Sequence, residues 1–450
     1  MANTQNAALK RIHSLLDEGS FVEIGAYVTS RTAANDPTED KNGDGVITGY
    51  GTIDSCLVYV YAQDAAYMGG SVGEMHAKKI SKIYDMAMNM GAPVVALVDC
   101  AGVRLTEGND SLYSFGQMFA HEAKASGVIP QITAVFGSCG GGMAVSASMS
   151  DFVFMESSNG KLFLNSPNAV EGNYEEKCDT ASAKYQSEVT GLCDFVGTED
   201  EIFAGIRELL SVLPENNERY NASYSDCNDD LNRAVDGIEA VKDKAEMIRA
   251  IADNGLFVEV KKNHAVSMTT GFIRLNGQTI GVVANNASLI DHFGAKKAIK
   301  FVNFCDAFNI PVLTLTDVDG FARDESNEIS LARALGKLTF TYAKSNVPKV
   351  TVITGHAYGT AGVVMNTKAI GSDIVYAWTS AEMGLMDKDL LKKISDETAD
   401  GNVNAALYNA RRGYVDDIIV PNETRQRVIA AFEMLYTKTD AEIFRKHGTI

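Results

Sequence analysis

The stretch "QITAVFGSCGGGMAVSASMSDFVF", residues 131–154, joins an apolar run to a run of small residues through three consecutive glycines. The first run is rich in β-branched residues, as buried strands are, and the second is compatible with a helix. Gly140, Gly141 and Gly142 therefore mark a strand-to-helix turn, where glycine usually permits close approach by a ligand or another backbone. The free N–H groups of a helix start favour negative charge, so we expect an anionic group at this turn.

The same pattern occurs a second time in the chain. "GAPVVALVDCAGVRLTEG" (91–108) matches "NIPVLTLTDVDGFARDES" (309–326), and "PQITAVFGSCGGG" (130–142) matches "PKVTVITGHAYGT" (348–360), always 218 positions later. A constant spacing across several motifs indicates an internal duplication, because mere similarity between parallel strands would not fix it. Each copy predicts strand, glycine turn, helix, strand, glycine turn and helix, which gives an α/β fold with buried parallel strands.

Composition limits the classes of protein that this chain can belong to. It has 450 residues, a net charge of −18 and seven cysteines without a CxxC pair. The acidic balance argues against a nucleic-acid surface, and the scattered cysteines indicate reduced thiols. No signal-like or membrane-spanning apolar run is present, so we expect a cytoplasmic protein, with docking onto a membrane complex as an open alternative. The polar stretch 214–236 is the expected link between the two copies.

Common catalytic and metal motifs are missing from the sequence. The glycines fit neither a Walker A loop nor a Rossmann fingerprint, and there is no G-x-S-x-G or HExxH. "DKNGDGVITGYG" (40–51) approaches a calcium loop, but its twelfth position is Gly51, so we interpret it as the entry to a hairpin and expect no metal site. His356 is the only histidine in a glycine-rich turn, and we expect a packed or capping role for it. Two turns rich in backbone N–H groups then remain as oxyanion sites.

Several long motifs resemble the carboxyltransferase subunit of biotin-dependent acyl-CoA carboxylases and the related decarboxylases. They include "GYGTIDSCLVYVYAQDAAYMGGSVGEMHAKKISKIYDMA", "DCAGVRLTEG", "TGFIRLNGQTIGVVANN" and "VPKVTVITGHAYGTAG". The resemblance extends over nearly the whole chain. It implies two tandem crotonase-like ββα-superhelix domains, which we place at residues 1–222 and 223–450.

The resemblance also implies roles for individual residues. Acyl-CoA would bind at the first domain, with the thioester enolate on Gly141 and Gly142. Biotin would bind at the second domain, with its ureido oxygen on Gly359, Thr360 and Ala361. The residues expected to flank these two sites are Ala101, Gly102, Gly140, Gly320, Phe321 and Tyr358. Replacement of Gly142 by valine is expected to stop turnover and leave the fold intact.

The implied reaction moves a carboxyl group between carboxybiotin and the α-carbon of a short acyl-CoA. The chain has no biotinylation motif, so biotin must arrive on a separate carrier protein. A biotin carboxylase partner would indicate an acyl-CoA carboxylase, and a membrane decarboxylase subunit would indicate a sodium-pumping decarboxylase. The resemblance implies a homo-oligomer, a dimer or a trimer of dimers, with active sites between subunits. The alternatives are a catalytically degenerate scaffold subunit and a free-standing crotonase-type hydratase.

The chain departs from the family pattern at a few positions. Thr360 stands where a glycine is usual, and Gly362 and Val363 replace an aromatic residue and an aspartate. After "SAEMGLMD" (380–387), "KDLLKKISDETADG" (388–401) takes the place of a glycine-rich stretch. These differences leave the acyl chain length and the direction of the reaction open.

Overall fold

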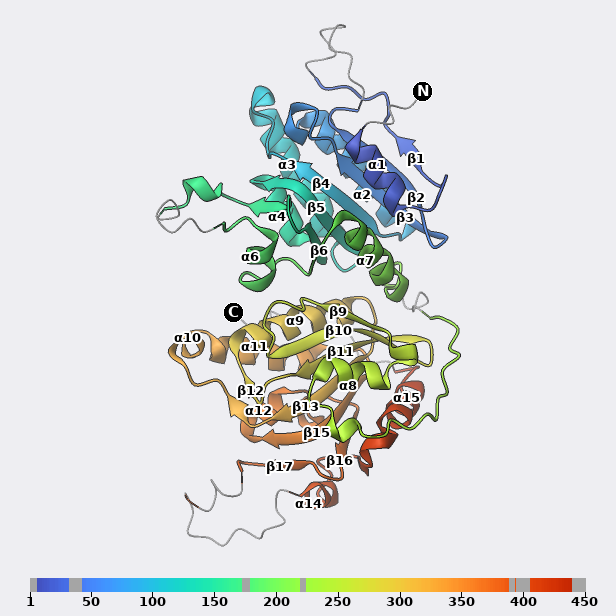
Figure 1. Ribbon diagram of the computed structural model, residues 1–450, viewed down its shortest axis with the longest axis vertical. Helices are drawn as coiled ribbons and strands as arrows, with labels where there is room; N and C mark the ends of the chain where they lie inside the picture. The colour runs from blue at the N-terminus through green and yellow to red at the C-terminus, as the bar shows by residue number, and fades with distance from the viewer. Residues whose placement is uncertain are drawn as a thin grey trace. The chain divides into compact units, whose positions relative to one another are not determined.

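The computed structural model describes residues 6–31, 43–171, 179–218, 224–387, 393 and 405–438. It divides into two compact units, Met1–Asn221 and Ala222–Ile450. Each unit is an α/β structure built on one sheet (Figure 1). The segment 388–401, where the sequence departs from the family pattern, lies outside the described residues except for Lys393.

The elements of the first unit are α1 (Ala7–Leu15), β1 (Val22–Ile24), β2 (Val46–Ile53), β3 (Cys56–Gln63), α2 (Glu74–Met90), β4 (Val94–Cys100), α3 (Asn109–Ala125), β5 (Gln131–Gly140), α4 (Gly142–Met149), β6 (Phe152–Glu156), β7 (Lys161–Phe163), α6 (Ala183–Glu188), β8 (Phe195–Gly197) and α7 (Glu199–Val212). The sheet order is β1-β2-β3-β4-β5-β6-β8, and β7 pairs with the end of β5. Strands β3 to β8 pair in parallel, and β1 to β3 pair antiparallel.

The elements of the second unit are α8 (Lys244–Ile251), β9 (Phe257–Val260), β10 (Met268–Leu275), β11 (Gln278–Asn285), β12 (Leu289–Ile290), α9 (His292–Ala307), β13 (Val312–Val318), β14 (Gly320–Phe321), α10 (Glu325–Glu328), α11 (Leu331–Lys344), β15 (Lys349–Tyr358), α12 (Gly359–Val364), β16 (Ile374–Trp378), β17 (Glu382–Gly384), α14 (Ala406–Arg411), β18 (Asp417–Ile419) and α15 (Thr424–Met434). The sheet order is β18-β16-β15-β13-β11-β10-β9, with β17 on the end of β15.

The predicted duplication is present in the structure element by element. Strands β4 and β13 begin at Val94 and Val312, and β5 and β15 begin at Gln131 and Lys349, a difference of 218 in both cases. The hairpin strand β2 and its counterpart β10 begin at Val46 and Met268, a difference of 222. The second copy is therefore four residues shorter between β11 and α9 than the first copy is between β3 and α2, and the spacing stays at 218 from α2 and α9 to β5 and β15.

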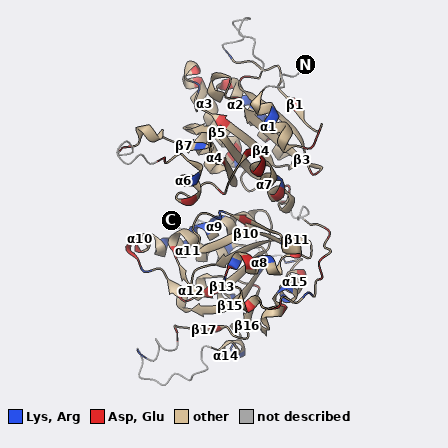
Figure 2. Ribbon diagram, in the orientation of Figure 1, with Lys and Arg blue, Asp and Glu red and all other residues tan. Residues whose placement is uncertain are grey.

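Neighbouring residues of a strand point to opposite faces of the sheet. Because the central strands are apolar at nearly every position, both faces of each sheet need to be covered, and helices cover them. In β5, Val135 belongs to the core beneath α2 and α3, whereas Phe136 packs on Phe203 of α7 at 5.4 Å between ring centroids. In β10, Phe272 packs on Phe301 of α9 and Ile273 belongs to the core beneath α8. The central strands are almost free of charged residues, which gather on helices and loops (Figure 2).

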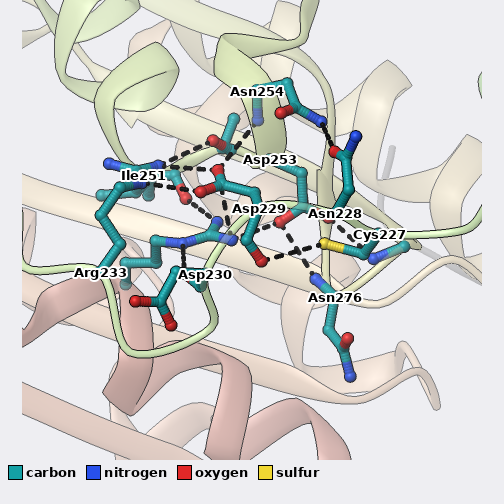
Figure 3. Close-up of polar contacts among 12 residues, drawn as sticks. Cys227, Asn228, Asp229, Asp230, Arg233, Ile251, Asp253, Asn254 and Asn276 are labelled. Carbon is teal, nitrogen blue, oxygen red and sulfur yellow. Dashed lines mark hydrogen bonds and ion pairs between the residues drawn. The ribbon is translucent and has the colours of Figure 1, made fainter.

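The stretch predicted to link the copies is only partly a connection. Its second half is anchored to the second unit through buried Arg425 of α15, which donates to the carbonyl of Asp230 at 3.3 Å and pairs with Asp229 at 3.4 Å. Asp229 accepts hydrogen bonds from Arg233 and from the N–H of Asn254 (Figure 3). Residues 224–236 are therefore part of the second unit, because these buried partners hold them in place.

Candidate functional site

The first glycine turn lies where β5 ends and α4 begins. Gly141 has φ 57° and ψ −120°, a backbone conformation that side chains rarely adopt. Its N–H donates to the carbonyl of Phe163 in β7 at 2.9 Å, and its own carbonyl accepts from Ala144 at 3.1 Å. The N–H groups of Gly142 and Met143, at the start of the helix, have no acceptor among the described residues. These two groups are the donors that the turn offers to a ligand.

The other two glycines of the turn are required by close packing. A Cβ on Gly142 would lie 2.7 Å from the ring of Phe115 in α3. A Cβ on Gly140 would lie 3.0 Å from the ring of Phe163 and 3.2 Å from the carbonyl oxygen of Ala101. A Gly142→Val variant would therefore have to displace the ring of Phe115, so the expectation that it keeps the fold intact stays a prediction with a packing cost against it.

Ala101 and Gly102 follow the neighbouring strand β4 and lie beside the turn. Gly102 has φ 113°, and a Cβ on it would lie 3.2 Å from the carbonyl oxygen of Gly140. Ala101 is exposed, and its N–H donates to the carbonyl of Gly69 at 2.9 Å. The two loops meet at the carboxyl ends of adjacent parallel strands, which is where α/β sheets bind their ligands.

A buried arginine fixes the loop after β4. Arg104 donates to the carbonyl of Ser71 at 2.7 Å and forms ion pairs with Asp44 and Glu107. Asp44 belongs to the calcium-like stretch, and its carboxylate also accepts from the N–H of His76 at 2.8 Å. The carboxylate of Asp44 therefore binds Arg104 and the N–H of His76. The stretch leads into the antiparallel β2–β3 hairpin, as expected. Asp40 and Asn42 of that stretch lie outside the described residues.

The second glycine turn repeats the first at the end of β15. Gly359 has φ 57°, the same value as Gly141, and α12 begins with Gly359, Thr360 and Ala361. Thr360 is exposed and Ala361 is buried. Gly320 and Phe321 form strand β14 in the loop after β13, and β14 packs against α12. The predicted residues of the second domain are thus brought together, as are those of the first domain around their own turn.

In both units, an aspartate on the neighbouring strand accepts a backbone hydrogen bond from the strand that leads into the turn. Asp99 at the end of β4 accepts a hydrogen bond from the N–H of Ser138 at 3.2 Å, and Asp317 of β13 accepts one from the N–H of His356 at 2.9 Å. A Cβ on the preceding Gly137 would lie 2.2 Å from the Asp99 carboxylate. Gly355 shows the same distance to Asp317, so the duplication has kept both the carboxylate and the space for it.

The two turns differ in their side chains. The first has Ala101, Ser138, Gly140 and Lys161 at positions where the second has Asp319, His356, Tyr358 and Glu382, as the strand registers show. The Tyr358 hydroxyl donates to Glu382 at 2.7 Å. Burial and this contact raise the pKa of Tyr358, so its hydroxyl keeps its proton.

Asp319 and Glu382 did not emerge from the sequence as site residues. The available signal was the alignment of the two copies, which sets Asp319 against Ala101. His356 is packed on one side, where its ring stacks on that of Tyr358 at 4.9 Å between centroids, but its side chain is also 46% exposed and its Nδ1 lies 2.7 Å from Asp319.

Glu122 is the carboxylate that lies beneath the first turn. It hydrogen-bonds Ser146 of α4, and burial raises its pKa to about 7. It is 1% exposed, so it cannot reach a ligand at the surface of the turn. Among the residues that the structure describes, no group of three or more metal-ligating side chains occurs, and none of their helices is long and apolar enough to cross a membrane.

Comparison with known proteins gives one consistent result. A model of the carboxyl transferase domain matches residues 2–395. The chain is 39% identical to a propionyl-CoA carboxylase beta chain of Roseobacter denitrificans, over 98% of this chain and 93% of the relative. It is 37% identical to the methylmalonyl-CoA decarboxylase subunit alpha of Veillonella parvula, over 100% and 94%.

The fold has a close counterpart among solved structures. Transcarboxylase 12S, a hexamer crystallised with hydrolysed methylmalonyl-coenzyme A, superposes with a TM-score of 0.91 and 34% identity, over 98% of this chain and 92% of that chain. The family resemblance and the expected crotonase-like α/β fold class are thereby confirmed.

Proposed function

Because the chain belongs to the carboxyl transferase domain family, as a carboxyltransferase of the propionyl-CoA carboxylase and methylmalonyl-CoA decarboxylase type, we propose that it exchanges a carboxyl group between carrier-bound biotin and the α-carbon of a short acyl-CoA. One observation carries this proposal. Gly141 and Gly359 have the same φ of 57°, each at the start of a helix and each in its own unit. The chain thus offers two equivalent sites for oxyanions.

The first turn takes the thioester in this proposal. The N–H groups of Gly142 and Met143, which have no acceptor among the described residues, stabilise the enolate oxygen that develops when the α-carbon becomes a carbanion. Gly141 shapes the turn, since its own N–H is taken by Phe163. Ala101, Gly102 and Gly140 line the same end of the sheet and leave room for the acyl chain.

The second turn takes the biotin ureido group. Carboxybiotin supplies the carboxyl group and the ureido nitrogen that exchanges it for the α-proton. Gly359, Thr360 and Ala361 form the first turn of α12, whose N–H groups lack partners within the helix, and Thr360 is exposed there. Gly320, Phe321 and Tyr358 border this position. The two turns act by placing donors and reactants together, so the chemistry requires no acid or base from the first unit.

The proposal includes partners and an assembly. Biotin arrives on a separate carrier protein in the cytoplasm. The other partner is a biotin carboxylase or a membrane decarboxylase subunit. We propose a homo-oligomer in which a thioester turn of one chain faces a biotin turn of another, because a two-fold axis forms two such sites at once. The related transcarboxylase 12S is a hexamer.

The direct test is carboxyl transfer by the purified full chain. Incubation with methylmalonyl-CoA and free biotin should produce propionyl-CoA only when biotin is present. Malonyl-CoA in place of methylmalonyl-CoA identifies the acyl chain length. Hydration of crotonyl-CoA without biotin would instead support a hydratase, and no turnover of any of these thioesters would support a scaffold subunit. Identification of co-purifying subunits then separates carboxylase from decarboxylase.

A further inference from the structure

We propose that Glu122 is a positioning residue for the first turn, because it holds helix α4 through Ser146 and thereby fixes the N–H donors at the start of that helix. The inference rests on the proposed function, since it takes the N–H groups of Gly142 and Met143 as the donors to the thioester oxygen. Glu122 is 1% exposed, so it acts only through the helix that it contacts.

Helix α3 contacts helix α4 at two points. The ring of Phe115 fills the space beside Gly142, where an added Cβ would lie 2.7 Å from it. Seven residues later in α3, about two helical turns, the Ser146 hydroxyl donates to Oε1 of Glu122. Ser146 lies four residues after Gly142, so both contacts fall on one face of α4. Two contacts one turn apart fix the rotation of α4 as well as its position.

The Glu122 carboxyl group lies in a closed space. Ser146 is 3% exposed, and Tyr61 of β3 and Tyr84 of α2 are buried beside the carboxyl group. Burial raises the pKa of both tyrosines, and the nearby Glu122 contributes to that rise. The second carboxyl oxygen, Oε2, has no hydrogen-bond partner among the described residues. Because a buried carboxyl group of this kind costs free energy of folding, the stability of the core does not explain it.

The second copy of the fold lacks this contact. At the positions of Glu122, Ser146, Tyr84 and Tyr61 it has Phe340, Val364, Val302 and Val283, as the spacing of 218 and the strand registers show. All four residues are apolar, so α12 is not held in this way. The duplicated fold by itself therefore does not require polar groups here, and they belong to the first turn alone.

The two turns are held by different contacts. In the second, Tyr358 directly precedes Gly359, and its hydroxyl donates to Glu382 at 2.7 Å. In the first, Gly140 stands in the place of Tyr358 and has no side chain for such a contact. Consecutive glycines also leave the backbone more conformational freedom. The contact between Glu122 and Ser146 supplies, from the far side of α4, the restraint that the first turn lacks at Gly140.

The test compares two buried serines. Ser146→Ala removes the contact with Glu122. Ser150→Ala is the matched control, because Ser150 lies at the other end of α4, where its hydroxyl is hydrogen-bonded to that of Thr133 at 2.6 Å. Both variants should lower the temperature of thermal unfolding by similar amounts, since each loses one buried hydrogen bond.

Carboxyl transfer by the full-length protein, with methylmalonyl-CoA and free biotin as probes, should separate the two variants. We expect Ser146→Ala to lower kcat about tenfold and to leave KM for methylmalonyl-CoA within about twofold, because misplaced donors weaken transition-state stabilisation and not thioester binding. Ser150→Ala should keep kcat within about twofold of the wild type, since it leaves the donor end of α4 in place.

Variants of Glu122 provide the conservative rescue. Glu122→Leu should lower kcat as Ser146→Ala does, and the double variant should lose no more than either single one, because one contact is removed in all three. Glu122→Gln keeps an oxygen that accepts from Ser146 and should bring kcat back to within about threefold of the wild type. The assay is run at about pH 6, where a carboxyl group with a pKa of about 7 holds its proton.

Three results would overturn the inference and leave the proposed function intact: equal kcat in Ser146→Ala and Ser150→Ala, a loss that appears mainly in KM, or a Glu122→Gln variant as impaired as Glu122→Leu. A wild-type protein that transfers no carboxyl group to biotin would instead overturn the proposed function, and this inference with it.

Discussion

Gly141 and Gly359 show how a single backbone angle defines both turns. At φ 57° a side chain is strained, whatever space surrounds it, and at Gly141 the Cβ position has no atom within 4 Å. Conformation rather than crowding thus requires glycine there. At Gly142 the reason is the opposite, because the ring of Phe115 fills the Cβ position. Two adjacent glycines therefore serve one turn for different physical reasons.

We expect Gly141→Ala to lower the free energy of unfolding by about 1–3 kcal/mol and carboxyl transfer by at least about tenfold, because the strained backbone relaxes and moves the donors of Gly142 and Met143. Thermal unfolding and transfer to free biotin measure the two effects. Gly116→Ala is the matched control: Gly116 lies inside α3 with nothing within 4 Å of its Cβ position. Alanine there should raise stability by up to about 1 kcal/mol. Unchanged activity in Gly141→Ala would contradict the role of this turn.

Glu122 gives a prediction about pH. Its folded pKa of about 7 lies above its ordinary value of 4.5 because the carboxyl group is buried. The folded state therefore keeps a proton that the unfolded state loses, and stability falls as pH rises from about 4.5 to 7. Glu122→Gln removes this loss. Relative to the wild type, the variant should gain up to about 3 kcal/mol between pH 5 and 8.

Urea unfolding at pH 5 and at pH 8 checks this difference, followed by fluorescence or by exchange of amides in the first unit. Glu208→Gln, at an exposed position of α7, is the control and should show no pH-dependent gain. Parallel stability curves for the wild type and Glu122→Gln would mean that the buried carboxyl group keeps an ordinary pKa.

At the scale of elements, helix α15 holds residues 224–236, the segment by which the chain enters the second unit, against that unit. Arg425 lies at the start of α15 with 0% exposure and reaches the carbonyl of Ile251, Asp253 and Asp229. Three segments far apart in the chain thus meet at one guanidinium, whose planar fork suits several acceptors. The anchor explains why the polar residues after 224 fold onto the sheet rather than remain a linker.

Arg425→Met should destabilise the second unit by about 3–5 kcal/mol, because removal of one partner leaves buried acceptors without compensation. The first unit should keep its stability, so amide exchange should accelerate only in residues after 224. The same helix provides the control. Arg427 forms a surface ion pair with Asp417, and Arg427→Met should change stability by less than about 1 kcal/mol. If both variants change the free energy of unfolding equally, then buried Arg425 stabilises the second unit no more than a surface arginine does.

At the scale of the whole molecule, the duplication supplies two turns on two separate units. The proposed reaction needs one turn for the thioester and one for biotin within reach of each other. In a symmetric dimer, each pair of facing turns combines units of different chains, so a single two-fold interface makes two complete sites.

Complementation between inactive variants tests this arrangement. Gly141→Val and Gly359→Val each place a β-branched residue at φ 57° and should each abolish transfer. Co-expression with two different tags and tandem purification yields hybrids, which should recover activity because one of their sites combines two intact turns. Hybrids that are as inactive as either parent would show that each site is built from a single chain.

The sequence by itself determined the duplication, the two strand-to-helix turns and the family. These features depend on local pattern: apolar strands, glycines at a fixed spacing of 218 and long motifs that each lie within one segment. The interpretation of the calcium-like stretch as the entry to a hairpin is also confirmed for its described part, which leads into the β2–β3 hairpin. Nearly all candidate residues were placed in this way at the carboxyl ends of β4, β5, β13 and β15.

Only the tertiary structure decided which groups remain available at those positions. The N–H of Gly141 is lost to Phe163, Phe115 excludes a side chain at Gly142, and Asp319 meets His356 across two loops. Arg425 likewise binds a segment almost 200 residues away. Each of these contacts joins residues that are distant in the chain, so their partners follow from packing and from the balance of buried donors and acceptors. No local periodicity contains that information.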